Sequence, residues 1–317
     1  CELASWDKAL QAEGKTATDA LKKEGESNEF RLGKTDLEEL EDFMDTKRIP
    51  HNVLIDCTAS GDVASKYPQW LQRGLHVISP NKKAPAGPLE LYQECIRSAG
   101  PSQAQWHYES TVGGQMPVIS LIDDLLQTGD TVTCVQGVFS GTMSYILEKL
   151  TRNPELKLSD MVAEAAEKGL TEPDPSEDLT GVDTARKAII VARELGLSVS
   201  MDNVQVESLL VNPGPGVDAE ADKRLAARLK EATDKYEQLS YVAEIDVEKE
   251  SVFVGLKSFP RDHPLAGVRE AETAVTFVTS RYPQATPLVV RGPGAGAVVT
   301  ASGVFADLLR LSKTLGS

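Results

Sequence analysis

The sequence predicts an α/β protein with two unlike regions: a parallel α/β region near the start of the chain and a mixed α+β region after residue 100. Residues 52–79 read as buried strand, helix and buried strand with short joints, which is typical of a βαβ unit with parallel strands. Residues 240–280 hold three strands of alternating apolar and polar residues, which indicate a largely antiparallel sheet.

Apolar spacing places the elements of the first region. Leu37, Leu40 and Phe43 fall on one helical face and predict a helix over residues 34–46. The elements that follow are strands over 52–57, 75–79 and 106–110 and helices over 61–74 and 87–100.

The second region begins with a helix over 117–129, in which Pro117 takes a favoured first-turn position. Gly196 is a good C-cap and ends a helix that starts near residue 182. The other elements are a strand over 133–139, helices over 141–150 and 159–168, a loop over 212–217, a charged helix over 218–239, strands over 240–247, 251–258, 273–280 and 287–291, and a helix over 303–316.

Composition and charge limit the classes of function. With 317 residues, 41% apolar and 26% charged, the chain can form a large core, and no run of it is long and apolar enough for a bilayer. The net charge of −15 argues against nucleic acid as a partner, because phosphate binding needs a basic stripe. The four cysteines have no metal-ligand spacing and indicate a reducing compartment; Cys57 and Cys134 are expected in the core.

An acid-rich segment, TEPDPSEDLTGVDTARK over residues 171–187, precedes an apolar helix. Asp183 and Lys187 are four residues apart and therefore share a helical face. Glu172 and Asp178 crowd the same helix start, and such a cluster suits the ammonium group of an amino-acid substrate, with the lysine as proton donor or acceptor. An ordinary surface ion pair is the alternative, and the residues alone leave both interpretations open.

Other motifs are weaker when each is taken alone. SPNKKAPAG (79–87) follows a parallel strand, where open α/β sheets place ligands, so Lys82 or Lys83 could meet a substrate or cofactor. In YESTVGGQMP (108–117), Glu109 with loop carbonyls suits sodium, although a plain glycine turn is favoured. In FSGTMSYIL (139–147), Thr142 binds a carboxylate or is a plain N-cap.

The glycine loop at residues 292–297, GPGAGA, is not a dinucleotide fingerprint, because too little chain follows it for a return strand. It still allows backbone to approach a bound cofactor closely.

Taken together, these segments resemble homoserine dehydrogenase, most closely the form found in fungi and in plant bifunctional aspartokinase–homoserine dehydrogenases. The resemblance covers about residues 52–317. It rests on six segments in the family's order: VLIDCTAS, PNKKA, YESTVGG, GVFSGTMSYI, TEPDPSEDLTGVDTARK and RGPGAGAVVTASGVFADLLRL.

The resemblance implies an incomplete Rossmann-like nucleotide-binding domain over residues 1–100, completed by about 292–317, and an α+β catalytic and dimerisation domain over 101–291. It implies NAD- or NADP-dependent interconversion of L-homoserine and L-aspartate 4-semialdehyde, toward threonine, methionine and isoleucine. It further implies a homodimer, an upstream aspartokinase domain, and the cytoplasm or plastid stroma as the compartment.

The resemblance also assigns roles to residues. Lys187, Asp183 and Lys82 match the catalytic positions, and Glu172, Asp178 and Thr142 match substrate-binding positions. Thr58, Lys82, Gly169 and Gly296 match cofactor contacts. Glu109, with the backbone of Val112, Gly114 and Met116, matches the family's sodium site.

Two departures from the family pattern stand out. No G-x-G-x-x-G turn precedes residue 52, so we expect the chain to start after the turn that holds the cofactor pyrophosphate. Gln115 and Met116 replace the residues more usual in the sodium loop. The alternative hypothesis is therefore a catalytically silent subunit that binds homoserine or only dimerises.

Overall fold

The computed structural model describes residues 36–44, 51–171, 175–211, 217, 219–269 and 272–316. The chain divides into two compact units, Cys1–Asp45 and Thr46–Ser317. In the first unit the described element is helix α3 (Leu37–Phe43), which lies within the predicted helix.

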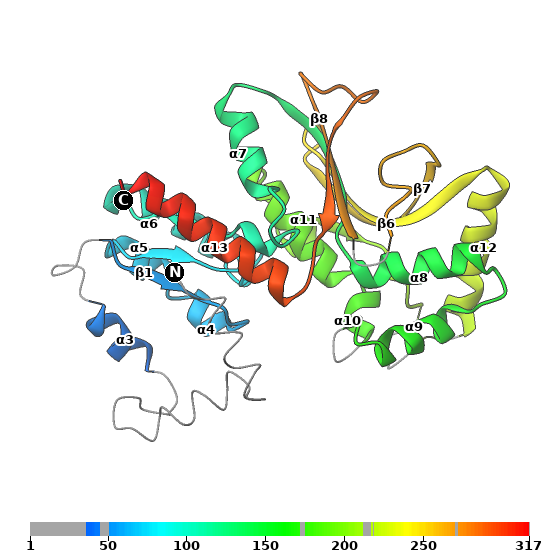
Figure 1. Ribbon diagram of the computed structural model, residues 1–317, viewed down its shortest axis with the longest axis horizontal. Coiled ribbons are helices and arrows are strands. Elements are labelled where there is room, and N and C mark those ends of the chain that lie inside the picture. Colours follow the sequence, from blue (N-terminus) through cyan, green and yellow to red (C-terminus); the bar gives the residue numbers. More distant parts are fainter. Residues whose placement is uncertain are drawn as a thin grey trace, which may run out of the picture. The chain divides into compact units, whose positions relative to one another are not determined.

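A small parallel sheet opens the second unit (Figure 1). It consists of β1 (Val53–Ile55), β2 (His76–Ile78) and β3 (Trp106–His107) in the order β1-β2-β3. Both neighbouring pairs are parallel, and all three residues of the central strand β2 are buried. The predicted parallel α/β region is confirmed.

The single helix predicted over 61–74 is wrong. Two helices stand there, α4 (Gly61–Ala64) and α5 (Tyr67–Gln72). Pro68 lies in the first turn of α5, and it explains the break, because a proline inside one continuous helix would clash with the carbonyl four residues earlier. Helix α6 (Leu89–Ser102) follows and packs against α5.

The last helix of the chain, α13 (Ala297–Thr314), lies against this first sheet (Figure 1). Val304 and Leu311 pack on Ile78 of β2. The helix begins at Ala297, earlier than the predicted start at residue 303. Gly303 lies inside it at a point of close packing, where a Cβ would overlap Ser110 Oγ.

A six-stranded mixed sheet forms the core of the rest of the unit, in the order β5-β7-β6-β4-β8-β9. Its strands are β4 (Val132–Val138), β5 (Val204–Val206), β6 (Glu237–Asp246), β7 (Ser251–Pro260), β8 (Glu272–Thr279) and β9 (Leu288–Pro293). Only the β5–β7 pair is parallel. The predicted, largely antiparallel sheet is confirmed, but β8 pairs with β4 and β9 and not with β7, the strand that precedes it in the chain.

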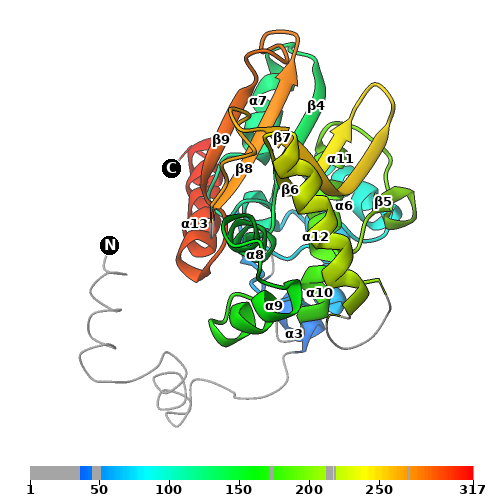
Figure 2. The ribbon, with the colours of Figure 1, turned by 90° about the vertical axis from the view of Figure 1, so that its right-hand side faces the viewer.

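Six helices accompany this sheet in the described residues, and α12 lies along β6 (Figure 2). They are α7 (Ile119–Gln127), α8 (Gly141–Arg152), α9 (Leu158–Glu167), α10 (Pro175–Leu179), α11 (Val182–Glu194) and α12 (Ala219–Asp234). Among the elements of the described chain, α10 and β5 were not predicted. Helix α12 stops at Asp234, short of residue 239, because Tyr236 is left-handed (φ 59°) and β6 begins at Glu237.

Strand β3 is also shorter than predicted. Glu109 and Ser110 belong to a 3-10 turn, η1 (Glu109–Thr111), rather than to the strand. Glu109 turns away to bind the start of α7, where its carboxylate accepts hydrogen bonds from three backbone amides.

Helix α11 is buried on nearly all sides against the mixed sheet. The residues of α11 that are fully buried or nearly so are Thr184, Ala185, Ala188, Ile189, Ile190, Val191, Ala192 and Arg193. Its start is set by Gly181, whose φ of 76° suits glycine and whose Cα lies against the hydroxyl of Tyr241. The position of α11 therefore follows from the core around it.

Two smaller expectations can be settled here. Cys57 was expected in the core but is exposed, because it follows β1 at the open end of the sheet; Cys134 is half-buried. Among the described residues, none of the helices combines the length and apolarity that crossing a bilayer requires.

The Gly181 turn allows a direct test. Gly181→Ala is expected to lower the free energy of unfolding by about 2–4 kcal/mol, because the new methyl group overlaps Tyr241 Oη while φ stays left-handed. Gly196→Ala is the matched control: its φ is 86° but open space surrounds the added carbon. Urea unfolding should show a loss of only about 1–2 kcal/mol for the control. Equal losses would show that Tyr241 does not constrain the turn.

Glu194, at the end of α11, gives a pH-dependent prediction. Burial raises the pKa of its carboxyl from 4.5 to about 7, although the Tyr108 hydroxyl donates to it and opposes the shift. As pH rises from about 4.5 to 7, the carboxyl is deprotonated in the unfolded chain but still protonated in the folded one. The free energy of unfolding therefore falls by up to about 1.4 kcal/mol per pH unit.

Glu194→Gln removes the titrating carboxyl and therefore its contribution to the pH dependence. The unfolding free energy of this variant should fall less between pH 5 and 7 than that of the unmodified protein. Urea unfolding at several pH values measures it. The control is Glu231→Gln on α12, whose carboxyl is exposed beside Lys235. Parallel pH curves for the Glu194 variant and the unmodified protein would contradict the assignment.

Candidate active site

A cavity of about 490 Å³ lies at the carboxyl ends of β1 and β2, beside the start of α11. The residues that line it are Thr58, Ala59, Pro80, Asn81, Lys82, Lys83, Thr180, Val182, Asp183 and Arg186. This is the edge at which open α/β sheets bind ligands.

Asp183 joins two lysines at this cavity. Its Oδ2 lies 2.8 Å from Lys187 Nζ, and its Oδ1 lies 3.4 Å from Lys82 Nζ. Lys187 Nζ also donates to the Phe139 carbonyl at 2.9 Å. Lys187 and Asp183 come from one turn of α11, whereas Lys82 comes from the loop after β2, so only the tertiary structure brings the three together.

The charges around Asp183 determine its protonation. Burial by itself would raise the pKa of this carboxyl, but the charges of Lys187 and Lys82, and hydrogen bonds from both, outweigh burial and lower the pKa to about 2. Asp183 is therefore a carboxylate at neutral pH, and it holds both ammonium groups at one point of the cavity wall.

A polar network shapes the loop that carries Lys82. Asp56, at the end of β1, accepts from the Thr58 amide at 2.7 Å and from Asn81 Nδ2 at 3.0 Å. Asn81 also donates to the Ser60 carbonyl and accepts from the Lys83 amide, each at 3.0 Å. The two loops after β1 and β2 are thus tied to each other.

Thr142 and Asp178, which the resemblance assigns to substrate binding, lie together. The Thr142 hydroxyl lies 2.6 Å from the Leu170 carbonyl and 3.2 Å from Asp178 Oδ1. Thr142 is not the N-cap of α8; the side chain of Ser140 fills that position by accepting from the Met143 amide. Glu172 lies outside the described residues.

The expected cofactor residues are distributed unevenly. Thr58 and Lys82 line the cavity. Gly169, with φ 67°, follows the end of α9, and Gly296, with φ 116°, precedes α13; neither lines this cavity of the described chain. Their assignment as cofactor contacts stays a prediction.

Glu109 is buried, and its carboxylate is already satisfied. It accepts from the amides of Val118, Ile119 and Ser120 at 2.7, 2.8 and 3.0 Å and pairs with Arg310 Nη1 at 3.1 Å. These partners are N–H donors, one of them cationic, whereas sodium needs free oxygen ligands.

The rest of the expected sodium set is the loop that contains Val112, Gly114 and Met116, which is buried. In the described part of the chain, no cluster of three or more His, Cys, Asp or Glu residues is arranged to hold a metal ion. The residues present therefore do not fit a cation at Glu109, and we assign no chemical step to one. The sodium site stays a prediction.

Sequence reasoning missed three contributors. Asp56 ends a strand in LIDCTAS, and its position directly after buried residues could have been read as a ligand-edge signal. Arg186 precedes Lys187 and lines the cavity, which its place on the same helical turn as Asp183 could have indicated. Arg193 carried no local signal for a role at the site, because its partners in the Lys82 loop, the Pro85 and Gly87 carbonyls, are distant in sequence.

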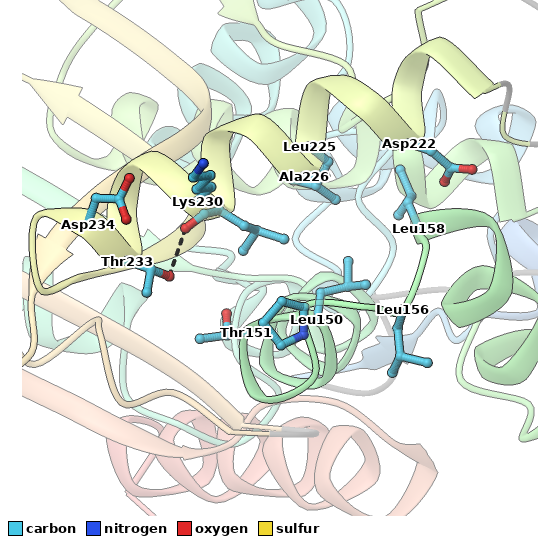
Figure 3. A pocket seen from close by; sticks show the side chains of 12 residues that line it. Leu150, Thr151, Leu156, Leu158, Asp222, Leu225, Ala226, Lys230, Thr233 and Asp234 are labelled. Carbon is cyan, nitrogen blue, oxygen red and sulfur yellow. Dashed lines mark hydrogen bonds between the residues drawn. The ribbon is translucent and has the colours of Figure 1, made fainter.

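A second hollow, of about 320 Å³, lies between the end of α8 and α12 (Figure 3). Leucines from both sides face one another there, among them Leu150, Leu156 and Leu225, and Lys230 is the only cationic residue that lines it. Without a group of converging charges, this hollow is not the candidate active site.

Comparison with known proteins identifies the family of the chain. The sequence-family model described as "Homoserine dehydrogenase" matches residues 117–309, and the one described as "Homoserine dehydrogenase, NAD binding domain" matches residues 10–109. A protein of Emericella nidulans named homoserine dehydrogenase is 40% identical over 282 residues, covering 83% of this chain and 76% of that protein.

The chain belongs to the homoserine dehydrogenase family.

Another relative in this family is the chloroplastic bifunctional aspartokinase/homoserine dehydrogenase 1 of Arabidopsis thaliana. It is 40% identical over 307 residues, which cover 94% of this chain but 33% of that protein. The chain thus spans about a third of the length of the plant relative. The crystal structure of a Candida auris protein of unknown function has a TM-score of 0.84 at 32% identity, covering 92% of this chain and 84% of that one.

The contacts of Glu109 predict that sodium does not stabilise the fold specifically. The midpoint of thermal unfolding should be the same in sodium chloride and in choline chloride at equal ionic strength, because amides and Arg310 already satisfy the carboxylate. Differential scanning calorimetry measures it. A rise specific to sodium that disappears in Glu109→Gln would contradict this and support the sodium site predicted from the sequence.

Proposed function

We propose that this chain is the homoserine dehydrogenase part of its protein and interconverts L-homoserine and L-aspartate 4-semialdehyde with NAD or NADP, toward threonine, methionine and isoleucine. The observation that carries the proposal is the convergence of Lys82 and Lys187 on Asp183 in the wall of a cavity at the carboxyl ends of parallel strands. Family membership supports it.

The cavity fits the nicotinamide half of the cofactor. Thr58, Ala59, Pro80 and Asn81 are among the residues that line it, at the sheet edge where dinucleotides bind. When bound there, the nicotinamide supplies or accepts the hydride. We propose Thr58 and Lys82 as its contacts, with Gly169 and Gly296 as further cofactor residues.

The lysines account for proton transfer. Oxidation of homoserine removes a hydride from its C4 carbon and a proton from its hydroxyl, and the reverse reaction returns both. We propose that Lys187 exchanges this proton, because its ammonium group is half-buried and oriented by Asp183 and the Phe139 carbonyl. Lys82 lies on the other side of Asp183 and orients the substrate oxygen.

The remaining charges suit an amino acid. Arg186 and Lys83 line the cavity with Lys82, so the cationic groups that line it outnumber Asp183 and favour the substrate carboxylate. We propose that Asp178 and Glu172 bind the ammonium group, with Thr142 holding Asp178 in place through its hydroxyl.

The relatives support a proposal for the partners and the compartment. The Arabidopsis relative is bifunctional and chloroplastic by name. We therefore propose an aspartokinase domain elsewhere in this protein and the plastid stroma as its location, with the cytoplasm as the alternative. We further propose that the dehydrogenase part forms a homodimer.

No observation on the described residues favours the silent-subunit alternative. A subunit that only binds homoserine has no need for two lysines on one carboxylate. The pair is what proton transfer beside a hydride-transfer centre requires.

The test is reduction of NAD or NADP on adding L-homoserine to the full-length protein, followed by absorbance. Lys187→Ala and Lys82→Ala are each expected to lower kcat/KM by roughly 10²–10⁴-fold, the usual contribution of a positioned acid–base group. Circular dichroism should show both variants folded.

Lys235→Ala is the matched control, because Lys235 also pairs with a carboxylate four residues away, Glu231, but lies exposed just after the end of α12. Its turnover should equal that of the unmodified protein. Unchanged turnover in Lys187→Ala would remove the assigned role, and absence of any turnover in the full-length protein would overturn the proposed function.

A further inference from the structure

Arg193 is a buried cation whose partners are backbone carbonyls. Its side chain is only 3% exposed. Nη1 donates to the Pro85 carbonyl at 2.8 Å, Nη2 donates to the Gly87 carbonyl at 2.8 Å, and Nε and Nη2 donate to the Val199 carbonyl at 3.0 and 2.9 Å. The guanidinium also lies 5.3 Å from the ring centroid of Tyr92.

Burying the charged guanidinium of Arg193 costs free energy that filling the core by itself does not require. Among the described residues, Arg193 has no carboxylate within ion-pair distance, and a buried charge without a counter-charge is costly. An apolar side chain of similar size would fill the same space at lower cost. The fork of donors does something that an apolar side chain cannot: it binds three carbonyls from two separate segments at fixed angles.

Two of the three carbonyls belong to the loop that carries Lys82. This loop, residues 80–88, is a tight turn: the Ala86 amide donates to the Lys82 carbonyl at 2.9 Å, and a Cβ on Gly87 would overlap the Lys83 carbonyl. Its first part is tied to β1 through Asn81 and Asp56. Arg193 holds its last part.

The same helix carries the groups that Lys82 must meet. Asp183 and Lys187 lie on α11 upstream of Arg193. Because Arg193 binds the loop to α11 itself, the 3.4 Å separation between Lys82 Nζ and Asp183 Oδ1 is set within the frame of one buried helix.

We propose that Arg193 is a positioning residue that fixes the Lys82 loop to α11 and thereby places Lys82 beside Asp183. It touches neither substrate nor cofactor and acts through Lys82. This deepens the proposed function and rests on it for the kinetic part of its test, whereas the structural part does not depend on activity.

The structural part is hydrogen exchange of backbone amides. In Arg193→Lys one ammonium group replaces the fork and cannot bind all three carbonyls, so the amides of Lys83 and Ala86 should exchange about tenfold faster, the expected effect of losing one charged hydrogen bond. Amides of β2 and β6 should keep their rates. Arg193→Gln, which keeps a donor without a buried charge, is the second variant in case the first does not fold.

The kinetic part uses a double-mutant cycle in the full-length protein. Alone, Arg193→Lys should lower kcat for homoserine by roughly 10–100-fold with little change in KM, because small misplacement of a catalytic group has effects of this size. In a Lys82→Ala background the same change should cost less than about threefold, since the group it positions is already gone.

Arg228→Lys is the matched control, because Arg228 also donates to a carbonyl, that of Leu256, but far from the cavity. It should leave exchange in residues 80–88 and kcat unchanged. Unchanged exchange of Lys83 and Ala86 in the Arg193 variant, or a full loss of kcat repeated in the Lys82→Ala background, would overturn the proposal. If the unmodified protein does not oxidise homoserine, the proposed function fails, and the exchange result alone decides the role of Arg193.

Discussion

The burial of α11 is the constraint on which the rest of the second unit depends. A helix that is apolar around most of its circumference can be stable only with partners on several sides, and here the strands β6 and β7, with other helices, provide them. Its start is fixed by the Gly181 turn against Tyr241, and its later turns are fixed by the core. Asp183 and Lys187 are therefore attached to a rigid support, which is where precise chemistry belongs.

Each charged group of the Asp183 cluster is stabilised by a partner of opposite charge or by a hydrogen bond. Asp183 stays ionised between two ammonium groups, and Lys187 has a carbonyl as a second partner. The neighbouring network of Asp56 and Asn81 satisfies the polar groups where two strands end. Buried polar networks of this kind rigidify a site when every member has a partner. The result is a cavity wall whose geometry is set before any ligand arrives.

Glu109 shows how the same residue type can have a different use. A buried carboxylate beside a glycine loop is the local pattern of a cation site. Here, however, the carboxylate accepts hydrogen bonds from the backbone amides at the start of α7 and pairs with Arg310 of α13. It thus joins η1 and the start of α7 to α13, because Arg310 lies 201 residues further along the chain. The local pattern alone cannot distinguish the two uses, because both require an acidic side chain next to a tight turn.

Much of the secondary structure could be predicted from local periodicity. The parallel strands β1 and β2, the long strands β6 and β7 and the helix α11 all appear where apolar spacing places them. Two short elements were not predicted: β5 has three residues and α10 has five, too few for a hydrophobic period to be visible. The break between α4 and α5 and the early end of α12 depend on single residues, Pro68 and Tyr236, that interrupt otherwise regular patterns.

The sequence by itself determined the local elements, the pairing of Asp183 with Lys187 four residues apart, and, through its motifs, the family. Only the tertiary structure decided that Lys82 meets the same carboxylate, that β8 lies between β4 and β9, and that α13 packs on the first sheet. It also decided that Arg193 binds the Lys82 loop. The physical reason is that helical and strand periods report only on neighbours along the chain, whereas these contacts join segments whose approach depends on how the whole core packs.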